Sequence, residues 1–79
     1  MRPWTRVDGF VRAYGLTPAE RRVLDALIDG DGVDRIAGRL GIGRATVKTH
    51  LNRILAKTGT TRQSDLIRLV AGTLPPLRG

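Results

Sequence analysis

Apolar residues recur along this chain at spacings of three and four, which is the period of an α-helix with one buried face. Glycine, which readily adopts the left-handed conformation that ends helices, or proline, which cannot continue one, follows each such segment. The pattern predicts an all-α fold with helices over residues 18–29, 33–40, 44–57 and 62–72.

The four predicted helices are short enough to share one domain, which we expect at residues 16–73. Residues 1–15 are expected to form a linker or N-terminal extension, in which the apolar spacing permits a short helix, and residues 74–79 a C-terminal tail. All aromatic residues lie in the extension, where we expect them to cover the edge of the domain: Trp4, Phe10 and Tyr14. A chain of 79 residues buries only about 60% of its unfolded surface, so its core is small.

The first predicted helix has a well-defined start. Thr17 can accept a hydrogen bond at the N-cap, Pro18 suits the first helical position, and Glu20 stands three residues after the cap. Threonine and glutamate at this spacing form a capping box, in which each side chain accepts from the other residue's backbone amide. We therefore expect Thr17 and Glu20 to fix the beginning of this helix.

The two middle helices are joined by a turn at Gly41, Ile42 and Gly43, which is the layout of a helix-turn-helix. When the residues of 44–57 are placed 100 degrees apart, the apolar ones collect on one side of the helix. The opposite arc contains no acidic residue and mixes small with hydrogen-bonding side chains: Ala45, Lys48, Thr49, Asn52, Arg53 and Ala56. Such an arc is narrow enough to enter the major groove of DNA.

The net charge of +7 is concentrated in one part of the chain. Residues 1–31 carry five basic and five acidic side chains, whereas residues 32–79 carry nine basic ones against Asp34 and Asp65 alone. Between Arg35 and Arg62 there is no carboxylate. Uneven positive charge attracts phosphate polymers. Charge alone indicates a nucleic-acid-binding surface and an ordinary solvated basic surface equally.

The residues for other chemistry are missing from the sequence. There is no cysteine, His50 is the only histidine, and no GxxxxGK phosphate loop is present, so we expect no catalytic residue, no metal site and no cofactor. The carboxylates between Asp25 and Asp34 lack the spacing of a calcium loop, which favours capping and solubility. No apolar run approaches the roughly 18 residues of a membrane span, so no membrane partner is expected.

Nucleic-acid binding, by contrast, has suitable side chains on the arc of 44–57. Lys48 and Arg53 can reach guanine acceptors, Asn52 can pair bidentately with adenine, and the Thr49 methyl can pack on thymine. The backbone amides of residues 44–46 can bind a phosphate. Readers of single-stranded RNA usually stack bases on aromatic side chains, and this basic region has none, so double-stranded DNA is the expected partner.

Four segments and one glycine in a specific order indicate a known family: LTPAERRVL at 16–24, Gly30, IAGRLGI at 36–42, TVKTHL at 46–51 and KTGTTRQSDLIRLV at 57–70. With them, the chain closely resembles the LuxR-type C-terminal DNA-binding domain, also called GerE or FixJ/NarL type, of bacterial transcriptional regulators. The resemblance implies four helices, of which the third enters the major groove and the fourth forms a dimer on DNA.

The resemblance also implies roles for individual residues. Base contacts fall on Lys48, Thr49, Asn52 and Arg53. Contacts to the DNA backbone, or positions beside it, fall on Thr46, His50 and Lys57, and the amides at the start of the helix add Arg44 and Ala45 to these contacts. The dimer interface falls on Leu66, Leu69, Val70 and Thr73 of the fourth helix. The apolar positions of this helix spread over more than one narrow stripe, so part of them can face the core and part a partner.

The sequence thus predicts a cytoplasmic bacterial regulator domain, of the response-regulator kind, that binds double-stranded DNA as a homodimer with half-sites about 10 base pairs apart. RNA polymerase is a further candidate partner, and a receiver or effector domain is expected outside this chain. Two alternatives stay open: a promoter-reading module like region four of a sigma factor, and a helical module that binds an acidic protein.

Overall fold

The computed structural model of the chain describes residues 7–73, and these form helices with no strand. The all-α fold is therefore confirmed. The helices are α1 (Val7–Tyr14), α2 (Pro18–Ile28), α3 (Val33–Leu40), α4 (Arg44–Thr58) and α5 (Gln63–Thr73). The expectations for Trp4 and for the tail at 74–79 concern residues outside this description.

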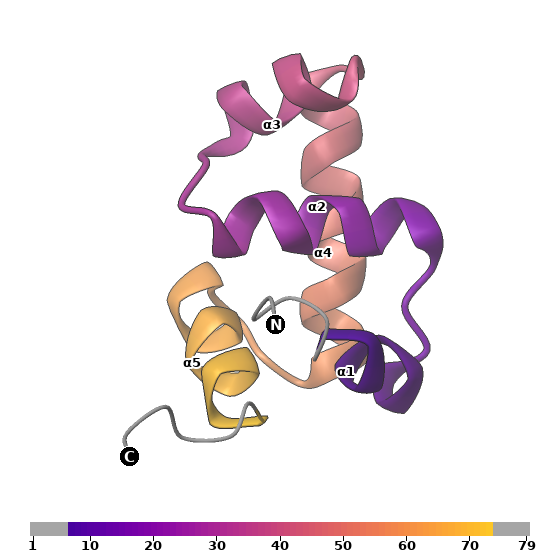
Figure 1. Ribbon diagram of the computed structural model, residues 1–79. Helices are drawn as coiled ribbons and strands as arrows, with labels where there is room; N and C mark the ends of the chain where they lie inside the picture. The colour runs from indigo at the N-terminus through magenta and orange to yellow at the C-terminus, as the bar shows by residue number, and fades with distance from the viewer. Residues whose placement is uncertain (1–6, 74–79) are drawn as a thin grey trace.

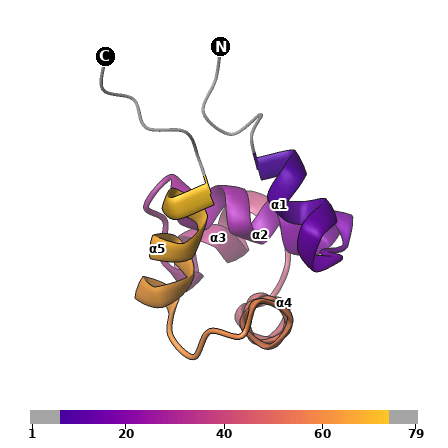
Figure 2. The ribbon, with the colours of Figure 1, turned by 90° about the horizontal axis from the view of Figure 1, so that it is seen from below.

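Helix α2 lies across α4 near the middle of the molecule, as Figure 1 shows. Helix α3 packs on the first part of α4, while α1 and α5 contact each other at the opposite end of the molecule. Seen along the axis of α4, the other helices lie to one side of it (Figure 2). Helix α4 therefore has one side in the protein and one side open to solvent.

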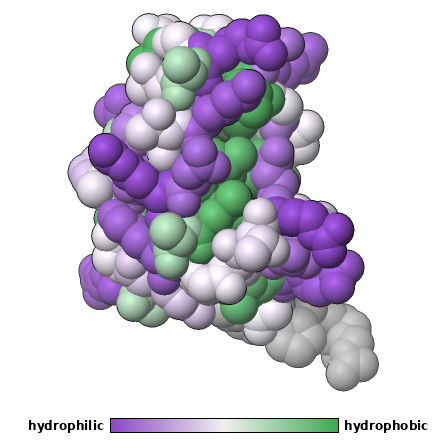
Figure 3. Space-filling view, turned by 180° about the vertical axis from the view of Figure 1, so that it is seen from behind, coloured by the Kyte–Doolittle hydropathy of each residue, from purple (hydrophilic) through white to green (hydrophobic). Residues whose placement is uncertain are grey.

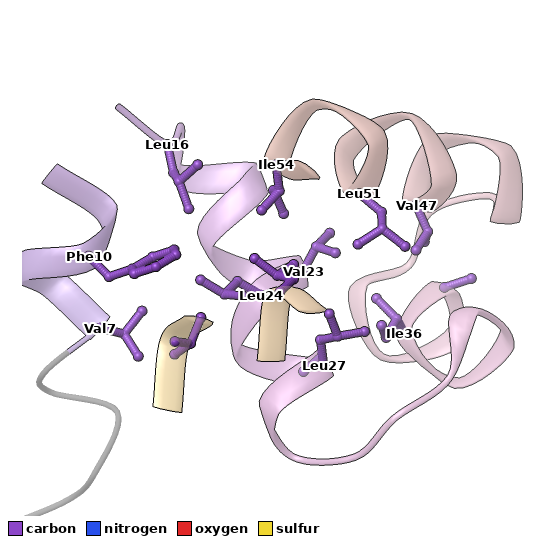
Figure 4. Packing of buried hydrophobic residues seen from close by; sticks show 14 residues of the cluster. Val7, Phe10, Leu16, Val23, Leu24, Leu27, Ile36, Val47, Leu51 and Ile54 are labelled. Atoms are coloured by element: carbon purple, nitrogen blue, oxygen red, sulfur yellow. The ribbon is translucent and has the colours of Figure 1, made fainter. Parts of the chain in front are cut away.

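The core receives side chains from all five helices, and Figure 4 shows their packing. Val7 and Phe10 of α1 are buried in the same cluster as Leu24 of α2 and Ile54 of α4. The ring centroids of Phe10 and Tyr14 lie 4.7 Å apart. The helix that the sequence permitted in the N-terminal extension is thus present, and it is part of the core.

The start of α2 has the predicted capping box. The backbone amide of Glu20 donates to Thr17 Oγ1 over 3.1 Å, and the amide of Thr17 donates to Glu20 Oε1 over 2.9 Å. Because the first amides of a helix have no partner within it, this exchange satisfies two backbone donors and fixes where α2 begins.

The turn between α3 and α4 depends on glycine at its first position. Gly41 has a φ of 67°, a left-handed conformation that side chains rarely tolerate. Its neighbour Ile42 is half-buried against the core, and the Ile42 amide donates to Ala37 O over 3.1 Å. Gly43 then serves as the N-cap of α4 without a side-chain acceptor. The turn thereby sets the angle at which α4 leaves α3.

The observed helix ends differ from the predicted ones by one residue. Helix α2 ends at Ile28, α5 covers Gln63–Thr73, and α4 continues to Thr58. The Thr58 hydroxyl donates to Ile54 O over 2.8 Å and lies 2.9 Å from Thr60 Oγ1. These side-chain bonds stabilise an additional position at the end of α4, which apolar spacing could not indicate. No helix within residues 7–73 is long and apolar enough to cross a membrane.

Candidate nucleic-acid interface

The open side of α4 carries the side chains that the sequence placed on the arc. Ala45, Lys48, Thr49, Asn52 and Arg53 are all exposed. The apolar stripe is turned inward: Val47, Leu51 and Ile54 are buried. Figure 3 views the molecule from the side on which α4 lies, where hydrophilic side chains predominate beside a narrow hydrophobic strip.

Three of the predicted base-contacting side chains, those of Lys48, Asn52 and Arg53, have no hydrogen-bond or ion-pair partner among residues 7–73. The Thr49 hydroxyl donates to Ala45 O over 3.0 Å, within its own helix. Its hydroxyl is therefore engaged, and the methyl group is the part of Thr49 that remains to meet a thymine methyl.

The first turn of α4 is exposed at Arg44, Ala45 and Thr46. Because Gly43 supplies no side-chain acceptor, the first amides of α4 stay available to an anion, and the helix dipole favours one there. Arg44 has a partner in the structure, however: its Nε lies 2.6 Å from Asp34 Oδ1 at the start of α3. A phosphate contact by Arg44 has to displace this carboxylate.

His50 lies between the exposed and the buried side of α4. It is half-buried, and its Nδ1 is buried without a hydrogen-bond partner in the described part of the chain. Its place beside the DNA backbone stays a prediction. Among residues 7–73, no three histidine, cysteine or acidic side chains are grouped to hold a metal ion.

Lys57 makes contacts within the protein that the sequence did not indicate. Its Nζ donates to Glu20 Oε1 over 2.7 Å and to Gly15 O over 3.0 Å. The Glu20 side chain is 1% exposed and the Lys57 side chain 34%. The ammonium of Lys57 thus ties the end of α4 to the start of α2, and its contact with the DNA backbone stays a prediction.

The surroundings of Glu20 keep it ionised. Burial raises the pKa of its carboxyl, but hydrogen bonds from Lys57 and Thr17 and the charge of Lys57 together outweigh burial and lower the pKa below its usual 4.5. A buried carboxylate with charged and backbone donors is stable in that form. Glu20, the acidic member of the capping box of α2, is therefore also the anion that positions the end of α4.

Two of the four residues predicted for a dimer interface are buried inside the domain and have no surface to offer a partner. Leu66 and Val70 are buried in the core of the chain itself, because these positions of α5 face the other helices. Leu69 is only partly buried and lines a shallow pocket with Thr60, Asp65, Arg68 and Gly72. The prediction for Thr73 concerns a side chain outside the description.

The loop between α2 and α3 contains a second contact that sequence reasoning missed. Arg39 Nη1 lies 3.3 Å from Asp29 Oδ2 and 2.5 Å from Asp31 Oδ2. The hydrogen bonds that Arg39 donates to both carboxylates, together with the negative charges of the carboxylates, raise the pKa of Arg39 above its usual value. The carboxylates predicted to cap and solubilise this loop also attach it to α3.

Comparison with known proteins places these features in a family. Residues 15–70 match the family described as bacterial regulatory proteins, luxR family. The chain is 32% identical over 62 residues to the HTH-type transcriptional regulator MalT of Cronobacter sakazakii, covering 78% of this chain and 7% of that protein. The MalT proteins of Yersinia enterocolitica and Serratia proteamaculans are 32% and 30% identical over 63 residues, each match covering 80% of this chain and 7% of the relative. No solved structure gave a significant match.

Proposed function

Because the chain belongs to the luxR family of bacterial regulatory proteins, we propose that it is a DNA-binding domain of a transcriptional regulator. Helix α4 enters the major groove of double-stranded DNA and reads base edges, while the turn before it and the start of α4 contact phosphates. The site of action is the bacterial cytoplasm.

The observation that carries this proposal is the open side of α4. Lys48, Asn52 and Arg53 are exposed and unpaired within residues 7–73, and no carboxylate stands between Arg35 and Arg62. A helix held on one side by a buried apolar stripe presents such side chains in a fixed arrangement. The family match and the similarity to regulators named MalT support the same reading.

Binding to random-sequence duplex DNA at low salt tests the function most directly. We expect retention that weakens steeply as salt rises, because phosphate contacts release counterions. Selection of bound duplexes from a random pool then gives the preferred sequence, the half-site spacing and the symmetry. Failure to retain any duplex at low salt would refute the proposal and favour a module that binds an acidic protein.

We further propose that two copies bind adjacent half-sites about 10 base pairs apart, with contacts through α5 around Leu69. Of the residues predicted for the dimer interface, Leu66 and Val70 are buried. Leu69 is only partly buried, so it is the described apolar side chain of that group with surface left for a partner. Leu69→Ala should weaken binding to a paired site about three- to fivefold, as expected for an ordinary interface side chain. Binding of the same variant to a single half-site is the control and should match wild type; an equal loss on both would show that the substitution acts through the fold.

The chain covers about 7% of the length of the curated relatives that it matches. We propose that a receiver or effector domain outside these 79 residues supplies the regulating signal, and that RNA polymerase is the protein partner of the bound regulator. The luxR family match favours a regulator over the sigma-factor alternative.

A further inference from the structure

The exposed ion pair between Asp34 and Arg44 lies where the proposed DNA contact begins. Arg44 opens α4, the helix proposed to enter the groove, and Asp34 stands in the first turn of α3. Arg44 Nε lies 2.6 Å from Asp34 Oδ1; the Arg44 side chain is 66% exposed and the Asp34 side chain 78%. Solvent therefore reaches both partners, and a pair of this kind is weak enough to exchange.

From this arrangement we infer that Asp34 is an intramolecular competitor of DNA phosphate for Arg44, which lowers the affinity of the domain for duplexes of any sequence. The inference rests on the proposed function. When α4 docks, Arg44 exchanges the Asp34 carboxylate for a phosphate oxygen, and the released carboxylate is left close to a polyanion.

The charge pattern makes this competition local. Asp34 is the last carboxylate before the acid-free stretch that ends at Arg62. Helix α4 itself therefore carries no acid that opposes phosphate. Each phosphate that a cation neutralises releases counterion from the DNA. A carboxylate freed beside the phosphate retains a cation in turn, and so cancels about one released counterion.

Asp34→Asn tests the inference, because it removes the charge while keeping the size of the side chain. Binding of a random-sequence duplex, measured by fluorescence anisotropy across a salt series, should tighten about two- to fivefold, the range of an exposed pair. The slope of log K against log salt should become steeper by about 0.9. In an Arg44→Gln background, the same Asp34 substitution should give no comparable gain.

The chain offers a control with the same change of charge in Asp65→Asn. Asp65 also stands in the first turn of a helix and is paired with an arginine, with Arg62 Nε and Asp65 Oδ2 3.6 Å apart. Both variants raise the net charge by one and remove one acid from a helix start, but only Asp34 is paired with α4. Thermal melting of both variants checks that the fold persists.

The outcomes separate the inference from the function on which it rests. If wild type binds duplex but Asp34→Asn changes neither the affinity nor the salt slope, the inference is wrong. An equal gain in affinity for Asp65→Asn, or a gain that persists in the Arg44→Gln background, would also contradict the inference. If wild type itself retains no duplex at low salt, the proposed function fails and the inference fails with it.

Discussion

Glu20→Ala is expected to lower the free energy of unfolding by about 2 to 3 kcal/mol, as the sum of a lost helix cap and a lost hydrogen bond to a charged group. Glu20 accepts from the Thr17 amide and from Lys57 Nζ with the same oxygen. Alanine leaves both donors without this acceptor. Lys57 is one-third exposed, so water can solvate its ammonium in part, which keeps the loss below that of a fully buried pair.

Urea denaturation of a double-mutant cycle measures the pair itself. Glu20→Gln keeps an acceptor for the cap but removes the charge, and Lys57→Met keeps the apolar stem but removes the ammonium. Each single variant should be destabilised, and the double variant should lose less than the sum of the two. Strict additivity would mean that Glu20 and Lys57 do not stabilise each other.

The same pair predicts how stability responds to acid. The pKa of Glu20 is lower in the folded chain than its usual 4.5, so the folded state favours the carboxylate. Its contribution is complete above about pH 4.5 and is lost as the pH falls through the lowered folded pKa. In urea titrations below pH 4.5, wild type should therefore lose its advantage over Glu20→Gln.

Lys57→Met also separates the structural role of this residue from a DNA contact. If the structural role is correct, the folded variant should bind a random duplex with the salt slope of wild type. A slope of log K against log salt that is flatter by about 0.9 would indicate that Lys57 also contacts a DNA phosphate, as the sequence predicts.

Asn52→Ala is expected to weaken binding to the selected DNA sequence by about 1 to 3 kcal/mol, which is roughly 5- to 150-fold. Asn52 is exposed at the centre of the open side of α4, and a bidentate pair with adenine is the contact that its carboxamide can make in the major groove. Alanine removes both hydrogen bonds and leaves the helix intact, because alanine has the highest helix propensity.

The signature of base reading is the difference between two probes. Asn52→Ala should relax the preference for one base and leave the affinity for random duplex nearly unchanged. Gln63→Ala removes another exposed carboxamide, at the start of α5, and should affect neither probe. Equal losses for Asn52→Ala on selected and random DNA would count against a base contact.

Local rules predicted most of the fold because its helices are marked by local signals. The capping box at Thr17, the left-handed Gly41 and the apolar stripe of α4 each depend on residues within a few positions of one another. The division of α4 into a buried and an exposed side could be predicted for the same reason.

Contacts between distant positions could not be predicted in this way. Glu20 and Lys57 are 37 residues apart, and each has a sufficient local explanation, one as a cap and the other as a surface cation. The apolar residues of α5 likewise show a stripe but not which part of it the core covers, and so Leu66 and Val70 were placed in an interface. Tertiary packing decides both cases.

The burial of α1 has a consequence for where the domain can be cut. The family match begins at residue 15, yet Val7 and Phe10 lie in the core with Leu24 and Ile54. The segment matched by the family is therefore shorter than the segment that contributes side chains to the core of this chain. A fragment trimmed to the family boundary would keep every proposed DNA contact and lose part of the packing that holds α5, so fragments intended for binding studies should retain α1.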